Sequence, residues 1–354
     1  MTLKVDGVSK RLGAFSLRNV SLEVGDSDYF VLLGPTGAGK TVLLELIMGF
    51  HRPEKGGIFL NGRDITNVPP EKRGLGYVPQ NCPLFPHMTV FENVDFGLKM
   101  RRRPVAERKQ SVHRMLELVG LEEKGERTPE ALSSGERQKV VLARVLATEP
   151  KVVLLDEPLA SIDAEASRGL REELKRINRE LGAAVLHVTH DQIEAFILAD
   201  RVAIMRNGAI VQKGRPNEVL SDPIDEFVAR FLGYENVFRV RLVENEGQRS
   251  KVSINGVEIR LAGRLESQEA TVAIRPEDIL IGTEALSVVG DWNILEGDVK
   301  GYVDMGPFVE VEVEAGLPVK VFVDKRSFLG SNLSEGRRVR VGFRVESVKV
   351  VGRH

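Results

Sequence analysis

A glycine-rich loop near the N-terminus has the residue types and spacing of a phosphate-binding loop. It follows the pattern G-x-x-x-x-G-K-[ST] with Gly34, Pro35, Thr36, Gly37, Ala38, Gly39, Lys40 and Thr41. Glycines let backbone N–H groups curl around a phosphate, which a Cβ would obstruct. We expect Lys40 to reach the β- and γ-phosphates of a nucleotide and the Thr41 hydroxyl to hold Mg²⁺. A chance glycine turn is the alternative, but the apolar run before the loop and the helical pattern after it favour phosphate binding.

Two adjacent carboxylates, Asp156 and Glu157, end a second apolar run. An open parallel sheet binds ligands at the carboxyl ends of its strands, so we expect Asp156 beside the phosphate loop, holding Mg²⁺ through water. Glu157, one residue further, is expected to polarise the attacking water. A solvent-facing acidic turn is the alternative. His190 ends a third apolar run in the same way, where an imidazole can hydrogen-bond a γ-phosphate or hold the water and Glu157 in line, unless it is merely structural.

A second anion site is predicted where Ser133 and Gly135 open a further helix. Ser133 and Glu136 have the spacing of a capping box, and simple capping is the alternative interpretation. A helix start with a serine and a glycine also attracts anions. One fold with two phosphate-seeking surfaces predicts that two copies of the chain sandwich the nucleotide.

The elements that must position these residues follow from the hydrophobic pattern. Apolar runs alternate with helical stretches, and the expected strand–helix pairs are 29–33 with 41–50, 152–155 with 165–181, and 183–189 with 192–198. Continuous apolar strands separated by helices indicate a parallel sheet that is covered on both faces.

The pattern changes near residue 235. Alternation in 309–314 and an Asn255-Gly256 turn between two short alternating segments predict antiparallel strands and a hairpin. No helix of any length is expected here, so the tail is predicted to be a small all-β, barrel-like domain. Residues 272–281 match 341–350 in apolar pattern, with Arg and Glu in register, and each segment follows a predicted hairpin. We therefore expect two similar halves.

Composition limits the functional classes. The 354 residues suggest two or three domains, and the formal charge of −1 gives no overall cationic field for nucleic acid or lipid. A single cysteine, Cys82, excludes a disulfide framework and a thiolate zinc cluster. No apolar run approaches the roughly 20 residues of a membrane-spanning helix. We expect a soluble protein whose membrane role, if any, comes through a partner.

Residues 1–232 resemble the ATP-binding subunits of ABC transporters of the importer type. The resemblance is carried by the phosphate loop, Gln80, the stretch Leu132–Gln138, Asp156-Glu157, Asp163 and Thr189–Asp191, which occur in the family's order. It implies an α/β P-loop NTPase fold of the ABC type with a helical subdomain at about 84–150. It also implies an ATPase that acts as a homodimer beneath integral-membrane permease subunits, at the cytoplasmic face of the membrane, together with a solute-binding protein.

The resemblance assigns roles to individual residues. Glu157 becomes the catalytic base, His190 the γ-phosphate contact, and Gln80 the sensor of γ-phosphate and Mg²⁺, with Thr41, Gln80 and Asp156 around the metal. Ser133 and Gly135 would contact ATP bound to the opposite protomer, and Asp163 would couple the two sites. Residues 81–100 would face the membrane subunit. Ser134 and Glu136 depart from the family's usual Leu-Ser-Gly-Gly-Gln, and Leu12 stands where the family has an adenine-stacking aromatic, with Phe15 as the nearby substitute.

Residues 235–354 resemble the C-terminal regulatory domain, OB-like in fold, of molybdate, tungstate or sulfate importer ATPases. Relatives of the molybdate type use a Ser-x-Arg-Asn loop in an oxyanion site, of which Gly290–Asn293 retains only Asn293. Asp291 would repel a regulatory oxyanion unless it is turned away. An oxyanion is the expected transported solute; sugar, polyamine or iron import, and a soluble ABC ATPase of DNA repair or translation, remain open alternatives.

Overall fold

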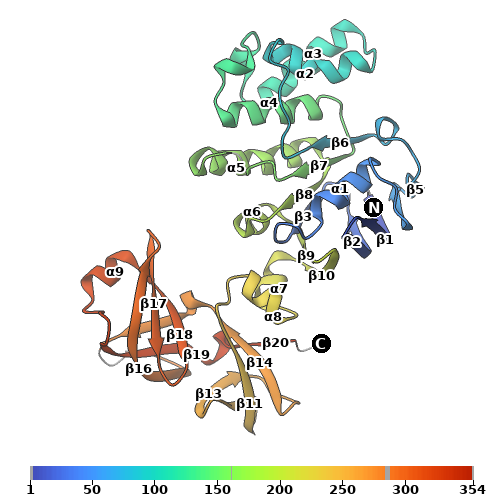
Figure 1. Cartoon of the computed structure of the whole chain (residues 1–354). Helices are drawn as coiled ribbons and strands as arrows, with labels where there is room; N and C mark the ends of the chain where they lie inside the picture. Colours follow the sequence, from blue (N-terminus) through green and yellow to red (C-terminus); the bar gives the residue numbers. More distant parts are fainter. Residues whose placement is uncertain (1–2, 161, 284–287, 353–354) are drawn as a thin grey trace. The chain divides into compact units, whose positions relative to one another are not determined.

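The computed structural model describes residues 3–160, 162–283 and 288–352. Its contacts divide into two compact units, Met1–Val219 and Leu220–His354, which Figure 1 colours from blue to green and from yellow to red. The domain boundary expected from the sequence, between 232 and 235, stays a prediction. In the described residues, no helix has both the length and the apolar character that crossing a bilayer requires.

A six-stranded sheet organises the first unit, in the order β10-β9-β3-β8-β7-β6. Its strands are β3 (Tyr29–Leu33), β6 (Leu75–Val78), β7 (Val152–Asp156), β8 (Ala184–Thr189), β9 (Arg201–Arg206) and β10 (Ala209–Gly214). All neighbours pair in parallel except β9 and β10. Every residue of β3, β7 and β8 is buried, as their uninterrupted apolar runs predict. The predicted parallel sheet is confirmed.

Helices follow the three predicted strands at their carboxyl ends. They are α1 (Lys40–Met48), α5 (Ala164–Leu181) and α6 (Gln192–Leu198). The expectation that the first helix runs to residue 50 is wrong, because Gly49 adopts φ 89° and its N–H bonds the carbonyls of Glu45 and Leu46. A left-handed glycine of this kind ends a helix.

Three helices that follow β6 and precede β7 along the chain lie together at one end of the unit in Figure 1. They are α2 (Val90–Met100), α3 (Val105–Leu118) and α4 (Ser134–Leu146), and α2 packs against both of the others. Complete capping boxes start α2, at Thr89 and Glu92, and α4, at Ser133 and Glu136. The 3₁₀ turns η2 (Glu122–Lys124) and η3 (Pro129–Ala131) lie between α3 and α4, and η1 (Pro70–Lys72) precedes β6.

An antiparallel sheet that the sequence analysis did not anticipate completes the first unit. Its order is β2-β1-β4-β5, with β1 (Leu3–Leu12), β2 (Phe15–Val24), β4 (Lys55–Leu60) and β5 (Arg63–Asp64). Its buried side chains share one apolar core with α1 and the central sheet. Two short helices, α7 (Pro216–Ser221) and α8 (Glu226–Phe231), follow β10 in the chain.

The second unit contains two five-stranded antiparallel sheets over one shared core. The first has the order β13-β12-β11-β14-β20, with β11 (Asn236–Glu246), β12 (Arg249–Ile254), β13 (Val257–Ala262), β14 (Glu269–Ile274) and β20 (Lys349–Val351). The second has the order β15-β19-β16-β17-β18, with β15 (Ile279–Gly282), β16 (Trp292–Asp304), β17 (Phe308–Glu314), β18 (Pro318–Asp324) and β19 (Arg338–Arg344). The short α9 (Lys325–Gly330) and the 3₁₀ turns η4 (Pro276–Asp278) and η5 (Val345–Ser347) complete it. The all-β, OB-like prediction is confirmed.

The predicted hairpin turn joins β12 to β13. Ile254 pairs with Val257, and the two residues between them have positive φ, 51° at Asn255 and 93° at Gly256. This is the type I′ geometry that Asn-Gly favours, because its twist matches that of the strands.

The two sheets have equivalent strand orders. In each sheet, one edge strand is formed by the chain segment that follows a strand of the other sheet. After β14 the chain passes through η4 and pairs β15 with β19; after β19 it passes through η5 and pairs β20 with β14. Val272 lies opposite Val350, and its counterpart Val341 lies opposite Ile281. The exchange therefore ties together the two segments that the sequence pattern had matched.

Two buried asparagines link the two sheets, and each bonds the backbone of an edge strand in the other sheet. Asn236, at the start of β11, accepts from Lys320 N–H at 2.7 Å and donates to Lys320 O at 2.9 Å. Asn293, near the start of β16, accepts from Arg260 N–H at 2.7 Å and donates to Arg260 O at 2.8 Å. Each carboxamide thus covers backbone groups on an edge strand, β18 or β13, that a further strand would otherwise occupy.

Candidate nucleotide site

The phosphate loop connects β3 to α1, and its glycines are required by close approach. A Cβ at Gly34 would lie 2.4 Å from the carbonyl oxygen of Met205, and one at Gly39 would lie 2.4 Å from the Phe15 ring. Gly37 and Gly39 also have φ of 80° and 102°, which L side chains rarely adopt. The loop backbone can therefore fold tightly over the start of α1, where helix N–H groups attract anions.

Lys40 is buried beneath this loop and points back into it. Its Nζ donates to Gly34 O at 2.8 Å and to Pro35 O at 3.1 Å, and lies 3.7 Å from Glu157 Oε1. Burial lowers the pKa of Lys40, against the opposing attraction of the Glu157 and Asp156 carboxylates. Its ammonium is thus held by two carbonyls and a carboxylate, the kind of contacts that phosphate oxygens can replace.

Three predicted site residues meet at the Glu157 carboxylate. Besides Lys40, Gln80 Nε2 donates to Glu157 Oε2 over 3.5 Å, and His190 Nδ1 lies 3.2 Å from the same oxygen. The Glu157 backbone has φ 46°, and its N–H donates to Val188 O at 2.9 Å. A left-handed glutamate is strained, and strain of this kind gathers at functional sites. The carboxyl ends of β6, β7 and β8 bring Gln80, Glu157 and His190 together.

The side chains of Thr41 and Asp156 form a second cluster, next in sequence to Lys40 and Glu157. Thr41 Oγ1 donates to Asp156 Oδ1 at 3.1 Å, and the Tyr77 hydroxyl donates to Asp156 Oδ2 over 3.4 Å. Burial is the main cause that raises the pKa of Asp156. A hydroxyl and a buried carboxylate in contact form a hard oxygen donor set, which fits Mg²⁺.

The other predicted phosphate contacts lie elsewhere in the first unit. Ser133 caps α4 and Asp163 caps α5, where its side chain accepts from Ala166 N–H at 2.9 Å. Gly135 is close to Ala166, so the starts of α4 and α5 are neighbours. In the described ranges, no hydrogen bond or ion pair joins Ser133, Gly135 or Asp163 to residues 34–41, and Figure 1 shows α4 apart from α1.

Four contacts in this unit escaped the sequence analysis. Tyr77 reaches Asp156, as described, and Lys124 pairs with Glu136 at the start of α4. The buried His187 accepts from or donates to the Tyr29 hydroxyl at 2.9 Å through Nδ1, and its Nε2 lies 3.3 Å from Glu194 Oε2. The only sequence signal for the two His187 contacts is the histidine itself, which stands inside an otherwise apolar run three residues before His190.

Of the two residues considered for adenine contact, Phe15 lies against the loop. Its ring approaches Gly39 and packs, partly buried, on the apolar core. Leu12 pairs with Phe15 at the hairpin end of β1 and β2. Of these two residues, Phe15 is therefore the one whose ring lies against the phosphate loop.

The C-terminal residues expected near an oxyanion are already engaged. Both polar atoms of the Asn293 carboxamide bond the Arg260 backbone. The Asp291 carboxylate forms an ion pair with Arg249. Asn293 therefore has a structural role here, with both its amide oxygen and its amide nitrogen bonded to the Arg260 backbone.

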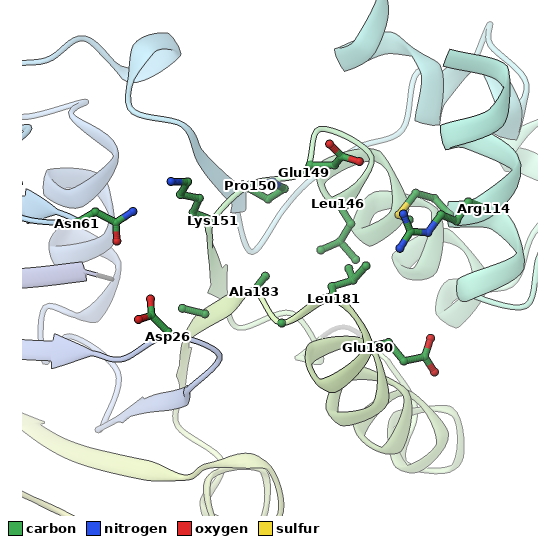
Figure 2. Close-up of a pocket in the computed structure, with 13 residues that line it drawn as sticks. Asp26, Asn61, Arg114, Leu146, Glu149, Pro150, Lys151, Glu180, Leu181 and Ala183 are labelled. Atoms are coloured by element: carbon green, nitrogen blue, oxygen red, sulfur yellow. The ribbon is translucent and has the colours of Figure 1, made fainter. Parts of the chain in front are cut away.

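A separate cavity of about 510 Å³ lies at the opposite edge of the central sheet. Lys151, before β7, and Ala183, before β8, line it together with Arg114 of α3 (Figure 2). These residues precede their strands, whereas the phosphate loop follows β3. The cavity is therefore distinct from the site around Lys40 and Glu157.

Comparisons with known proteins identify two families along the chain. Residues 17–160 match the family model described as ABC transporter, and residues 272–351 match the TOBE domain. A molybdate/tungstate import ATP-binding protein of Pyrococcus abyssi is 43% identical over 349 residues, which cover 98% of this chain and 99% of that protein. Its namesake from Thermococcus kodakarensis is 48% identical over 81% of this chain and 85% of its own length.

Other relatives serve a different solute or have known structures. A spermidine/putrescine import ATP-binding protein of Thermotoga maritima is 38% identical over 90% of this chain and 89% of its own. An ATP-binding cassette solved as a dimer in a post-hydrolysis state, with ADP and Pi, has a TM-score of 0.54. It is 27% identical and covers 60% of this chain and 98% of its own.

Proposed function

The chain belongs to the ABC transporter ATPases, in the branch of ATP-binding subunits that serve importers, and on this premise we propose that it acts as a homodimer that drives the uptake of molybdate or tungstate. As an importer ATPase it hydrolyses ATP and works with membrane-spanning permease subunits. The observation that carries the detailed mechanism is the convergence of Lys40, Gln80 and His190 on the Glu157 carboxylate.

The ATP phosphates bind in the loop Gly34–Thr41. In this proposal the γ-phosphate takes the place of the Gly34 and Pro35 carbonyls and of Glu157 around the Lys40 ammonium. The backbone N–H groups at the start of α1 complete the anion site. Phe15, whose ring lies against Gly39, is the proposed adenine contact.

Thr41 and Asp156, with Gln80 nearby, would hold Mg²⁺. The contact between the Thr41 hydroxyl and the Asp156 carboxylate supports this assignment, since both are hard oxygen donors. No cluster of three or more His, Cys, Asp or Glu that could hold a metal occurs in the described parts of the chain. Mg²⁺ does not need one, because it binds through one or two carboxylates, water and substrate phosphates. When bound, it would neutralise the charge that develops on the phosphates.

Glu157 is the proposed base that orients the attacking water. Once phosphate has replaced Glu157 as the partner of Lys40, the Glu157 carboxylate is free to accept from a water in line with the γ-phosphate. His190 and Gln80, both in contact with Glu157, hold it in that orientation and reach the γ-phosphate. The strained backbone at Glu157 supports a functional rather than a packing role.

Ser133 and Gly135 are proposed to complete the ATP site of the second copy. Their distance from the phosphate loop of their own chain supports contact in trans, and so does the dimeric state of the solved relative. Asp163, next to them at the start of α5, is proposed to couple the two sites. ATP would therefore close two copies on each other, and phosphate release would reopen them.

Location, partners and solute complete the proposal. The chain would sit peripherally on the cytoplasmic face of the membrane, with residues 81–100 toward the permease and a solute-binding protein on the other side. Molybdate or tungstate is favoured because the relatives that cover nearly the whole chain carry those names. Polyamine import is the second candidate, since the Thermotoga maritima relative also covers most of the chain. A regulatory oxyanion in the C-terminal unit is not favoured, because Asn293 is already bonded on both amide atoms.

The Glu157→Gln variant of the full chain tests the mechanism. We expect ATP turnover to fall by about 100-fold or more, as for loss of a catalytic base, while ATP with Mg²⁺ holds the variant as a dimer in light scattering. Glu180→Gln is the matched control, because Glu180 pairs with Arg176 on the surface of α5. Unchanged turnover in Glu157→Gln would refute the assignment of the base.

The solute requires a separate experiment. The permease complex is reconstituted in vesicles with the solute-binding protein encoded beside this chain, and ATP hydrolysis is measured with molybdate, tungstate, sulfate or spermidine. Stimulation by molybdate and tungstate alone supports the proposal, and stimulation by spermidine alone would replace it with the polyamine alternative.

A further inference from the structure

The start of α4 carries a negative charge at the place where, in the proposed mechanism, the γ-phosphate of ATP on a second copy binds. Glu136 Oε2 accepts from Ser133 N–H at 2.9 Å, and Ser133 Oγ accepts from Glu136 N–H at 3.3 Å. This reciprocal pair fixes the Glu136 carboxylate in the first turn, where the helix dipole favours it. The same carboxylate repels the triphosphate of ATP that approaches Ser133 and Gly135 from a second copy.

Lys124 supplies the opposite charge from a different segment. It ends the 3₁₀ turn η2, and its Nζ donates to Glu136 Oε1, the carboxylate oxygen that Ser133 does not use. Glu122, Glu123 and Glu126 are its near neighbours in sequence. Arg127 is a further cation of this segment, but the ion pair with the Glu136 carboxylate is formed by Lys124.

Both side chains of the pair are partly shielded from solvent. The Lys124 side chain is 29% exposed and that of Glu136 is 24% exposed. The hydrogen bond from Lys124, followed by that from Ser133, lowers the pKa of Glu136, so its carboxylate is ionised at neutral pH. The charge that Lys124 cancels is therefore present under the conditions in which ATP binds.

We propose that Lys124 is a positioning residue of the ATPase: its ion pair with Glu136 fixes the capping carboxylate and cancels its charge, so that the start of α4 can accept the γ-phosphate of ATP on a second copy. This inference rests on the proposed trans role of Ser133 and Gly135. On this proposal, Lys124 compensates for the negative charge that Glu136 introduces where the family usually has a glutamine.

The chain offers an isosteric variant that separates charge from capping. Glu136→Gln keeps a side-chain oxygen that can accept from Ser133 N–H, because Gln also serves in capping boxes, but it removes the negative charge. Lys124→Met removes the positive charge and keeps the side-chain length. If Lys124 acts by cancelling the charge of Glu136, the loss caused by Lys124→Met should be reversed when Glu136→Gln removes the negative charge as well, which a double-mutant cycle measures.

The experiment follows ATP-dependent dimerisation of the full chain, with Glu157→Gln present in every variant to prevent turnover. Lys124→Met, Glu136→Gln and the double variant are compared by sedimentation at about 50 mM and about 300 mM salt, since screening weakens interactions between exposed charges. Lys139→Met is the matched control: Lys139 lies in α4, the helix of Glu136, is 27% exposed and also pairs with a glutamate, Glu173, away from the helix start.

We expect Lys124→Met to weaken ATP-dependent dimerisation by roughly tenfold at low salt and less at high salt, as for one charge near a phosphate. Lys139→Met should leave dimerisation unchanged. The double variant, in which the pair again carries no net charge, should match the parent with Glu157→Gln alone. The proposal is overturned if Lys124→Met behaves like Lys139→Met, or if the double variant is as weak as Lys124→Met alone. If Glu157→Gln with no further change fails to dimerise with ATP, the proposed function itself fails, which is a distinguishable result.

Discussion

Asn293→Ala should destabilise the C-terminal unit by about 2–4 kcal/mol, because it leaves two buried backbone groups without partners. Asn293 is buried and bonds both Arg260 N–H, at 2.7 Å, and Arg260 O, at 2.8 Å. Each unsatisfied buried group costs about 1–3 kcal/mol, and partial access of water to the edge strand β13 reduces the sum. Asn236→Ala should cost a similar amount, since Asn236 bonds Lys320 of β18 in the same way.

The unfolding of this unit can be followed through Trp292, the single tryptophan of the chain, which lies in β16. Urea titrations that monitor its fluorescence give the free energy of unfolding of each variant, with the m-value as a check on two-state behaviour. Asn245→Ala is the matched control. Its carboxamide pairs in the same bidentate manner with the Leu265 backbone, but Asn245 is exposed, so water can replace the lost bonds.

Asn245→Ala should therefore cost less than about 1 kcal/mol. A loss below that value in both Asn236→Ala and Asn293→Ala would refute the argument that these amides join the two sheets. Stabilisation by molybdate of the wild type but not of Asn293→Ala would instead indicate that this residue is a ligand for the anion.

Two further predictions concern the first unit. Phe15→Ala should raise the KM for ATP by about fivefold or more, because base–aromatic stacking contributes about 1–3 kcal/mol, whereas Leu12→Ala should change it little; equal effects in steady-state assays would contradict the assignment of Phe15. Because the pKa of Glu136 is lowered by Lys124 and Ser133, the ionised carboxylate stabilises the fold above its unfolded pKa of about 4.3 and this is lost as the pH falls through the lower folded pKa. For this partly exposed pair, the advantage of wild type over Glu136→Gln in thermal unfolding should be below about 1 kcal/mol and should disappear in acid. A difference that stays constant with pH would contradict the ion pair.

The central sheet was predictable because its strands are buried on both faces. A strand such as β3 must then be continuously apolar, and such runs stand out in a sequence with helices between them. The carboxyl ends of those strands gather ligands by topology, so Asp156, Glu157 and His190 could be expected close together before their contacts were known.

The antiparallel sheet of the first unit carries a weaker signal. The pairing of β1 with β2 shifts register twice, between Val5 and Val8 and between Val8 and Lys10. Each bulge breaks the alternation of buried and exposed positions on which a strand prediction depends. Because the pattern loses its phase within ten residues, neither strand was recognised.

Contacts between distant segments left no pattern at all. Lys124 reaches Glu136 across a loop, and Asn293 reaches Arg260 from another sheet. Nothing in the type or spacing of such residues distinguishes them from surface lysines or turn asparagines. Resemblance in sequence pointed Asn293 toward an anion, and only its buried position between two backbone groups showed a structural role.

The contacts of Lys40 imply that ATP binding and activation of the base are one event in the proposed mechanism. In the structure, the Lys40 ammonium is 3.7 Å from Glu157 Oε1, so the carboxylate that must orient the water is paired with a cation. A γ-phosphate carries more negative charge than a carboxylate and competes for the same ammonium. The ATP that takes Lys40 therefore releases Glu157, which keeps its contacts with Gln80 and His190. A water would then be oriented for attack only when there is a phosphate to attack.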